Sequence, residues 1–185
     1  YIGSLLAMDK DLAKRLMRQA GIPTADWIIA DQNTAKSQII DTIGLPCVVK
    51  PCSAGSSIGV SIVENTEQLN AALDYARSID ENILAEKMIK GREFSVGILG
   101  KNALPVIEII PVEGFYDYKN KYQAGLTREI CPADLSREDS ERLQDLALKV
   151  HRTLRLGSYS RIDFIMNGQR EIFCLEANTL PGMTP

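Results

Sequence analysis

The chain has 185 residues, enough for one large domain or for two small lobes that each bury a core. Its hydrophobic and charged fractions, 45% and 24%, are ordinary, and the net charge of -3 is spread along the chain, which argues against a nucleic-acid-binding face. No apolar run reaches the roughly 18 residues that cross a bilayer. The four cysteines lack paired spacing, so we expect no zinc site. We also expect their thiols to be reduced and the protein to be cytoplasmic.

The first half of the sequence alternates predicted helices and strands around short turns. Asp9 is placed to cap a helix over residues 10–20, whose inward stripe is expected to be Leu12, Leu16 and Ala20. Thr34 and Thr66 are placed to cap two further helices. Short strands are predicted over residues 24–30, 46–50, 59–63 and 82–87.

The second half is richer in predicted strands. A hairpin is expected from strands over 93–99 and 103–110, joined at Gly100, and a second from strands over 158–166 and 171–175, joined at Asn167-Gly168. Residues 113–127 are polar and predict an ordered surface loop. Ser136 is placed to cap a long helix in which His151 is expected to be partly exposed. The inward residues of this helix are predicted to be Leu143, Leu146, Ala147, Val150 and Leu154.

A loop of small residues follows a lysine in the stretch VVKPCSAGSSIGV, residues 48–60. Backbone N–H groups of such a loop can converge on a phosphate, and Gly55 lets the backbone approach closely. Lys50 can place an ammonium beside the same phosphate. The loop lacks the Walker A spacing and leads to a strand. A plain Gly/Ser hairpin with an exposed lysine is an equal alternative on spacing alone.

Two short segments place oxygen ligands on strands. Arg161 and Asp163 share one face of their strand, and Glu176 and Asn178 share one face of theirs. If the two strands pair, two carboxylates and an amide oxygen form a hard site suited to Mg²⁺. Arg161 would lie beside the metal and stabilise an anionic transition state. The polar face of a half-buried hairpin is the alternative.

The segment LAEKMIKGREF, residues 84–94, connects the two halves. Its residues from Glu86 to Ile89 can offer backbone groups to an adenine edge, and Glu93 can accept hydrogen bonds from ribose hydroxyls. An ordinary charged connector between lobes would have the same composition.

Taken in order, these pieces resemble the successive motifs of D-alanine–D-alanine ligases. The segments that carry the resemblance are AMDK, VVKPCSAGSSIGV, EKMIKGREF, FYDYKNKY, SRIDF and LEANTLPGMTP. The last of these is the most specific, and FYDYKNKY narrows the match within ATP-grasp enzymes. The resemblance implies an α+β ATP-grasp fold, with ATP held between a small lobe over residues 1–92 and a large lobe over residues 93–185. It also implies that D-alanine and ATP are the substrates, that an acyl phosphate is the intermediate and that the dipeptide product feeds peptidoglycan synthesis.

The resemblance assigns roles to individual residues. Those that contact the ATP phosphates would be Lys10, Lys50, Ser57 and Lys121. Those around the adenine, the ribose and the rest of the nucleotide would be Glu86, Lys87, Ile89, Glu93 and Phe115. Those with catalytic roles would be Ser56, Tyr122, Arg161 and Gly182. Those that bind Mg²⁺, with Mn²⁺ as an alternative ion, would be Asp163, Glu176 and Asn178.

Departures from the family pattern limit the expected activity. The resemblance implies a further N-terminal domain and a serine after the LPGMT turn, neither of which is in this sequence. Ala54 stands where the family usually has glutamate. We therefore expect the chain to bind ATP weakly and not to ligate alone, and its full-length parent to be a cytoplasmic homodimer without nucleic-acid or membrane partners.

Three other functions remain open. They are a D-alanyl-D-serine or D-alanyl-D-lactate ligase, another ATP-grasp carboxylate–amine ligase and a nucleotide-binding module without turnover. Tyr122 argues against lactate as the second substrate. The presence of Arg161, Asp163, Glu176 and Asn178 together argues against a dead site.

Overall fold

The computed structural model describes residues 1–31, 33–55, 57–111 and 127–181. Its helices are α1 (Ile2–Met8), α2 (Lys10–Gln19), α3 (Lys36–Ile43), α4 (Thr66–Arg77) and α6 (Arg137–Thr153). The strands of the first sheet are β1 (Trp27–Ala30), β2 (Cys47–Pro51), β3 (Ser61–Val63) and β4 (Ile83–Lys87). The strands of the second sheet are β5 (Arg92–Leu99), β6 (Asn102–Ala103), β7 (Ile107–Pro111), β8 (Thr127–Ile130), β9 (Tyr159–Met166) and β10 (Ile172–Asn178).

The first sheet has the order β1-β4-β2-β3, and α3 and α4 pack on one of its faces. Cys47 and Val49 of β2 and Ile83 and Ala85 of β4 are buried against these helices. Because side chains alternate along a strand, Val48, Lys50, Leu84 and Glu86 point to the opposite face. The first sheet thus buries an apolar face under α3 and α4 and turns a mixed face toward the rest of the molecule.

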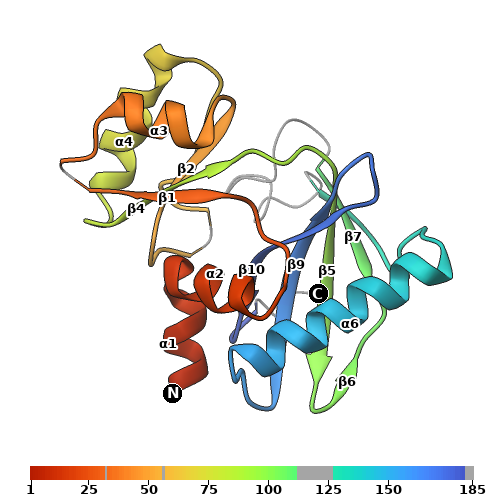
Figure 1. Ribbon diagram of the computed structural model, residues 1–185. Coiled ribbons are helices and arrows are strands. Elements are labelled where there is room, and N and C mark those ends of the chain that lie inside the picture. The colour runs from red at the N-terminus through yellow and green to blue at the C-terminus, as the bar shows by residue number, and fades with distance from the viewer. Residues whose placement is uncertain (32, 56, 112–126, 182–185) are drawn as a thin grey trace.

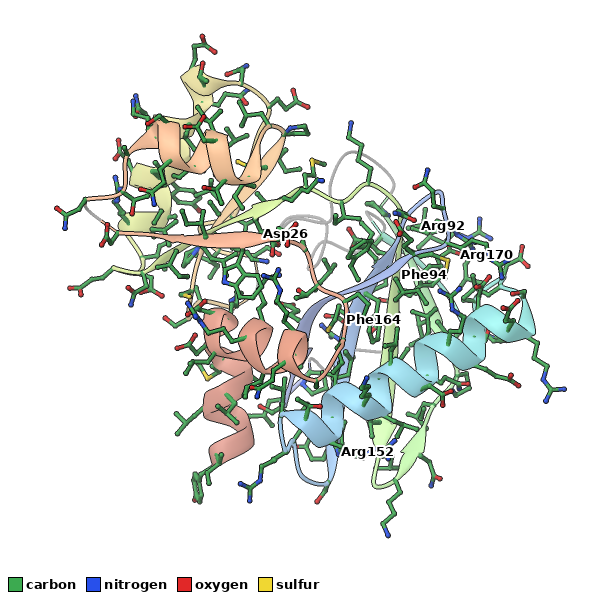
Figure 2. All side chains as sticks on the ribbon, viewed as in Figure 1. Asp26, Arg92, Phe94, Arg152, Phe164 and Arg170 are labelled. Carbon is green, nitrogen blue, oxygen red and sulfur yellow. The ribbon has the colours of Figure 1, made fainter. Side chains whose placement is uncertain are left out.

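The second sheet has the order β10-β9-β5-β7-β8, with β6 paired to β5, and α6 covers it. Phe94 of β5 and Phe164 of β9 lie opposite each other in register within this core, and both are labelled on the sheet beside α6 in Figure 2. The sheets lie between the α3–α4 pair on one side and α6 on the other (Figure 1). The face of β5 and β9 that carries Ser95 and Asp163 is the one opposite Phe94 and Phe164.

The N-terminal helices pack with the second sheet. Ala13 and Met17 of α2 belong to the same hydrophobic core as Phe94 and Phe164. Hydrophobic packing therefore joins α2 to strands more than seventy positions away in the chain. The division into lobes at residue 92 stays a prediction; residue 92 itself begins β5.

Several details of the predicted elements are wrong. The buried residues of α2 are Ala13, Lys14 and Met17; of the predicted inward residues, Leu16 and Ala20 pack against the core, but Leu12 is 45% exposed. The α3 helix follows Ala35 without a side-chain cap, because the hydroxyl of Thr34 is bound to Asp31. The predicted strand 103–110 is divided into β6 and β7 around Pro105, which has no N–H to donate to a sheet.

The three other predicted helix caps differ in outcome. The α4 helix is capped by Asn65, one residue before Thr66, while the predicted caps of α2 by Asp9 and α6 by Ser136 are confirmed. His151 is buried rather than partly exposed. Its Nδ1 lies 2.8 Å from the Ser160 Oγ and its Nε2 lies 3.1 Å from the Gly157 carbonyl, so the imidazole ties α6 to the start of β9.

The cysteines are free thiols, as predicted. Three of them are buried, and Cys131 is exposed. In the part of the chain that the structure describes, no helix is long and apolar enough to span a membrane.

Candidate functional site

A pocket lies between the two sheets, where their mixed faces meet. It is lined by the loop after β2, by β2 and β4 of the first sheet and by β5, β9 and β10 of the second. The predicted site residues that line it are Lys10, Lys50, Ser57, Glu86, Lys87, Ile89, Glu93, Asp163 and Glu176. Apolar side chains such as Val48 and Ile165 supply much of the remaining wall. A wall of this kind, with a few convergent charges, suits a planar ligand that carries an anionic group.

The first sheet contributes a buried carboxylate held by two ammonium groups. Glu86 Oε1 accepts a hydrogen bond from Lys50 Nζ at 2.5 Å, and Glu86 Oε2 accepts one from Lys14 Nζ at 2.9 Å. Val48 lies directly opposite Glu86 in the β2–β4 register, so Lys50 reaches it diagonally on the same face. Burial opposes ionisation of Glu86, but the charges of Lys50 and Lys14 outweigh it and lower its pKa to about 2.

The loop after β2 is held by Lys10 at the start of α2. The Lys10 ammonium donates to the carbonyl of Ala54, and the Lys10 backbone N–H donates to the carbonyl of Cys52 at 3.1 Å. Ser57 in the same loop has a φ of 56°, an uncommon conformation for a residue other than glycine. Burial lowers the pKa of the Lys10 ammonium, and Glu176 on the second sheet opposes that effect. Lys10 and Glu176 both line the pocket.

The second sheet gathers the predicted oxygen ligands around Asp163. Arg161 donates to both oxygens of Asp163, at 2.9 and 2.8 Å. Asn178 Nδ2 donates to Asp163 Oδ2 at 3.0 Å, and Ser95 Oγ donates to Asp163 Oδ1 at 2.8 Å. The strands β9 and β10 pair Glu176 with Asp163 and Asn178 with Arg161. The structure therefore brings together the four residues that sequence spacing placed on two faces.

The donor chemistry of this group fits a divalent cation. Two carboxylates and an amide are oxygen ligands of the kind that Mg²⁺ takes when it is shared with phosphates. In this arrangement Asp163 forms an ion pair with the guanidinium of Arg161. Within the described ranges no cluster of three or more histidine, cysteine, aspartate or glutamate side chains forms a metal site. Asp163 and Glu176 would thus rely on Asn178 and on substrate oxygens to complete a coordination shell.

Some predicted site residues lie outside the described residues. These are Ser56, Phe115, Lys121, Tyr122 and Gly182. Arg161 and Asn178 are described and reach the pocket through Asp163 rather than as part of its lining.

The geometry of the pocket agrees with what comparison with known proteins finds. The family model described as "D-ala D-ala ligase C-terminus" matches residues 16–185, which takes in both sheets and the lining of the pocket apart from Lys10. The chain belongs to the D-alanine–D-alanine ligase family. The D-alanine–D-alanine ligase of Desulfotalea psychrophila is 46% identical over 99% of this chain and 59% of that protein. The one from Syntrophobacter fumaroxidans is 47% identical over 99% of this chain and 61% of that protein.

Solved structures of family members share the fold. The D-alanine–D-alanine ligase from Bacillus anthracis superposes with a TM-score of 0.87 at 35% identity, over 99% of this chain and 60% of that one. The VanG D-Ala:D-Ser ligase from Enterococcus faecalis gives 0.83 at 31% identity, over 99% and 55%. The predicted α+β ATP-grasp class is confirmed by these structural neighbours. The chain spans about three-fifths of the length of its curated relatives.

Two residues beside this pocket were missed from the sequence. Ser95 is a polar residue between Phe94 and Val96 in an apolar strand, and its burial beside Asp163 is a signal that the pattern could have given. Lys14 lies outside the stripe of apolar residues from which the inward face of α2 was predicted, so the pattern gave no signal for it.

Proposed function

We propose that this chain carries the nucleotide site of an ATP-dependent ligase that joins two D-alanines through an acyl phosphate. The observation that carries the proposal is one pocket whose lining includes the ammonium groups of Lys10 and Lys50 together with the carboxylates of Asp163 and Glu176. Phosphoryl transfer needs cations around the phosphates and oxygen ligands for a metal within one enclosed site. Family membership and the names of the relatives support the choice of D-alanine.

In the proposed complex the first sheet binds most of the nucleotide. The segment from Glu86 to Ile89, which includes Lys87, would face the adenine. Glu93 would lie beside the ribose, and Phe115 would pack near the nucleotide. Lys10, Lys50 and Ser57 would contact the phosphates, together with Lys121. Val48 and Ile165 support this placement because they give the base an apolar contact from each sheet.

In the proposed reaction a carboxylate oxygen of the first D-alanine attacks the γ-phosphorus, and ADP leaves. The amine of the second D-alanine then attacks the acyl carbon and loses a proton, and phosphate leaves. Magnesium bound at Asp163, Glu176 and Asn178 would offset charge on the phosphoryl oxygens. Arg161 would stabilise the transferring group, and Gly182 would offer its backbone N–H to the developing oxyanion. Ser56 and Tyr122 would orient the first D-alanine.

Two experiments test the proposal. Calorimetric titration of the chain with ATP should give saturable binding with Mg²⁺ and weaker binding without it. The full-length parent should release phosphate with D-alanine, and less with D-serine or D-lactate as the second substrate. Phosphate release that is equal with and without D-alanine would reject the substrate assignment. Faster release with D-serine or D-lactate would instead favour the alternative ligases.

A further inference from the structure

Lys14 of α2 is a buried lysine that stands behind the pocket. Only 1% of its surface is exposed, and it is not among the described residues that line the pocket. Its ammonium donates to Glu86 Oε2 at 2.9 Å and to Thr24 Oγ1 at 2.6 Å. An ammonium this deeply buried is stable only when it is paired and hydrogen-bonded. Lys14 is therefore placed to act on the carboxylate of Glu86 and not on a ligand.

Glu86 has more positive than negative charge around it among the described contacts. One carboxylate is shared by two ammonium groups, Lys50 on Oε1 and Lys14 on Oε2. Lys50 lines the pocket, so an anionic ligand can attract it. When Lys50 turns to that ligand, Glu86 remains paired with Lys14. Without Lys14, the same movement would leave a buried carboxylate that has lost both of these cations, which is strongly unfavourable.

We infer that Lys14 is a positioning residue that keeps Glu86 paired, so that the Lys50 ammonium is available to a nucleotide phosphate. This inference rests on the proposed nucleotide site. The geometry gives Lys14 and Lys50 separate oxygens of Glu86, so Lys50 can leave without disturbing the other pair. The depressed pKa of Glu86 agrees with this arrangement, since the carboxylate stays ionised between its two partners.

The same ammonium also reaches the second sheet. The Thr24 hydroxyl, which accepts a hydrogen bond from Lys14, donates to the Cys174 carbonyl at 3.1 Å. The Cys174 N–H in turn donates to the Pro23 carbonyl at 2.9 Å. Cys174 lies two positions before Glu176 on β10. Lys14 thus connects the phosphate-facing lysine of the first sheet to the strand that carries a proposed metal ligand.

The test compares a ligand that has phosphates with one that lacks them. In Lys14→Met, calorimetry should show that the affinity for Mg·ADP falls by about tenfold to a hundredfold. The affinity for adenosine should stay as in wild type, because adenosine has no phosphate to attract Lys50. Lys101→Met, at an exposed position between β5 and β6, is the matched control and should bind both ligands as wild type does. Equal losses for ADP and adenosine would show a merely structural role and overturn the inference.

A second comparison removes the carboxylate that Lys14 is proposed to hold. In a Glu86→Gln background no carboxylate holds Lys50, so adding Lys14→Met should leave the ratio of ADP to adenosine affinity unchanged. The double variant should also recover the ratio lost in Lys14→Met alone. A further fall of the ratio in the double variant would overturn the inference. If wild type bound neither ligand, the proposed function would fail; if wild type and Lys14→Met bound ADP equally well, only the role of Lys14 would fail.

Discussion

Glu176 of β10 lies directly opposite Asp163 of β9, and an irregularity in β10 puts it there. The strands begin in one register, with Ile172 opposite Met166 and Cys174 opposite Phe164. Continued without change, that register would place Leu175 opposite Asp163. The register instead shifts between Cys174 and Glu176, as at a β-bulge, and one residue is passed over. The second carboxylate thereby joins the face that carries Asp163 and Arg161.

The pairing predicts that Asp163 controls the response of nucleotide binding to magnesium. Asp163→Asn keeps the size of the side chain and removes its charge. We expect ADP affinity in Mg²⁺ to fall by about tenfold or more, because a hard cation loses a charged ligand. Affinity without Mg²⁺ should not fall, because the variant removes a negative charge near the phosphates. Calorimetric titrations with and without Mg²⁺ measure both values.

Asp145→Asn on the exposed face of α6 is the control for this variant, and it should leave both affinities unchanged. If Asp163→Asn kept the full magnesium dependence of wild type, Asp163 would not be a metal ligand.

The pairs within each strand could be predicted, whereas the contact between strands needed the fold. The spacing of Arg161 and Asp163, and of Glu176 and Asn178, places each pair on one face because side chains alternate along a strand. The bulge that aligns the two pairs has no residue signature in CLEAN, residues 174–178, since it depends on how β10 fits against β9. The neighbourhood of Ser95 and Asp163 joins residues far apart in the chain, which periodicity cannot locate.

The N-terminal helix gives a second example. The cap at Asp9 and the extent of α2 follow from local chemistry and are confirmed. The face that α2 turns inward was predicted only in part: Leu16 and Ala20 pack against the core as predicted, but the helix is rotated so that Leu12 is exposed and Ala13 and Met17 are buried. That rotation also buries Lys14, whose partner Glu86 lies on β4 of the first sheet. Partners distant in sequence thus decide the orientation of a helix with two possible apolar stripes.

The buried carboxylate predicts an acid-sensitive contribution to stability. The pKa of Glu86 is lowered from 4.5 to about 2, a difference worth about 3 kcal/mol at ~1.4 kcal/mol per unit. Since the folded pKa is the lower one, the contribution is complete above pH 4.5 and is lost as the pH falls toward about 2. The gap in unfolding free energy between wild type and Glu86→Gln should therefore narrow over that range. Urea titrations at a series of pH values measure it.

Glu129→Gln on the exposed part of β8 is the control. The difference in unfolding free energy between this variant and wild type should not narrow as the pH falls from 4.5 toward about 2. A constant gap for Glu86→Gln between neutral pH and pH 3 would contradict the depressed pKa.

The connection between the sheets predicts strong sensitivity at Gly91. A Cβ at this position would lie 2.0 Å from the Met166 carbonyl oxygen, which is backbone and cannot rotate away. Gly91→Ala should lower the free energy of unfolding by about 1–3 kcal/mol, as overpacked sites do. Gly168→Ala, in the neighbouring hairpin turn where a Cβ meets nothing within 4 Å, should change it by less than about 0.5 kcal/mol. Similar losses in the two variants would show that the close approach is not the cause.

Ser95 is not among the described residues that line the pocket, and we predict that it supports the orientation of Asp163. Its side chain is buried, and its hydroxyl donates to Asp163 Oδ1 at 2.8 Å. Ser95→Ala removes that donor, so Asp163 is held on this side by Arg161 alone among the described contacts of Oδ1. We expect about 1 kcal/mol of lost stability. The affinity for Mg²⁺ in the presence of ADP should weaken by about tenfold, as when partners of metal ligands are removed.

Measuring both the stability and the Mg²⁺ affinity of Ser95→Ala separates an effect on the orientation of Asp163 from an effect on folding. Ser37→Ala on the exposed surface of α3 should change neither stability nor Mg²⁺ affinity. Magnesium titrations at saturating ADP measure affinity, and thermal unfolding measures stability on the same samples. A loss of stability with unchanged Mg²⁺ affinity would mean that the hydroxyl serves only packing of β5 against β9, because a carboxylate whose orientation mattered to the metal would bind it more weakly once one of its donors is gone.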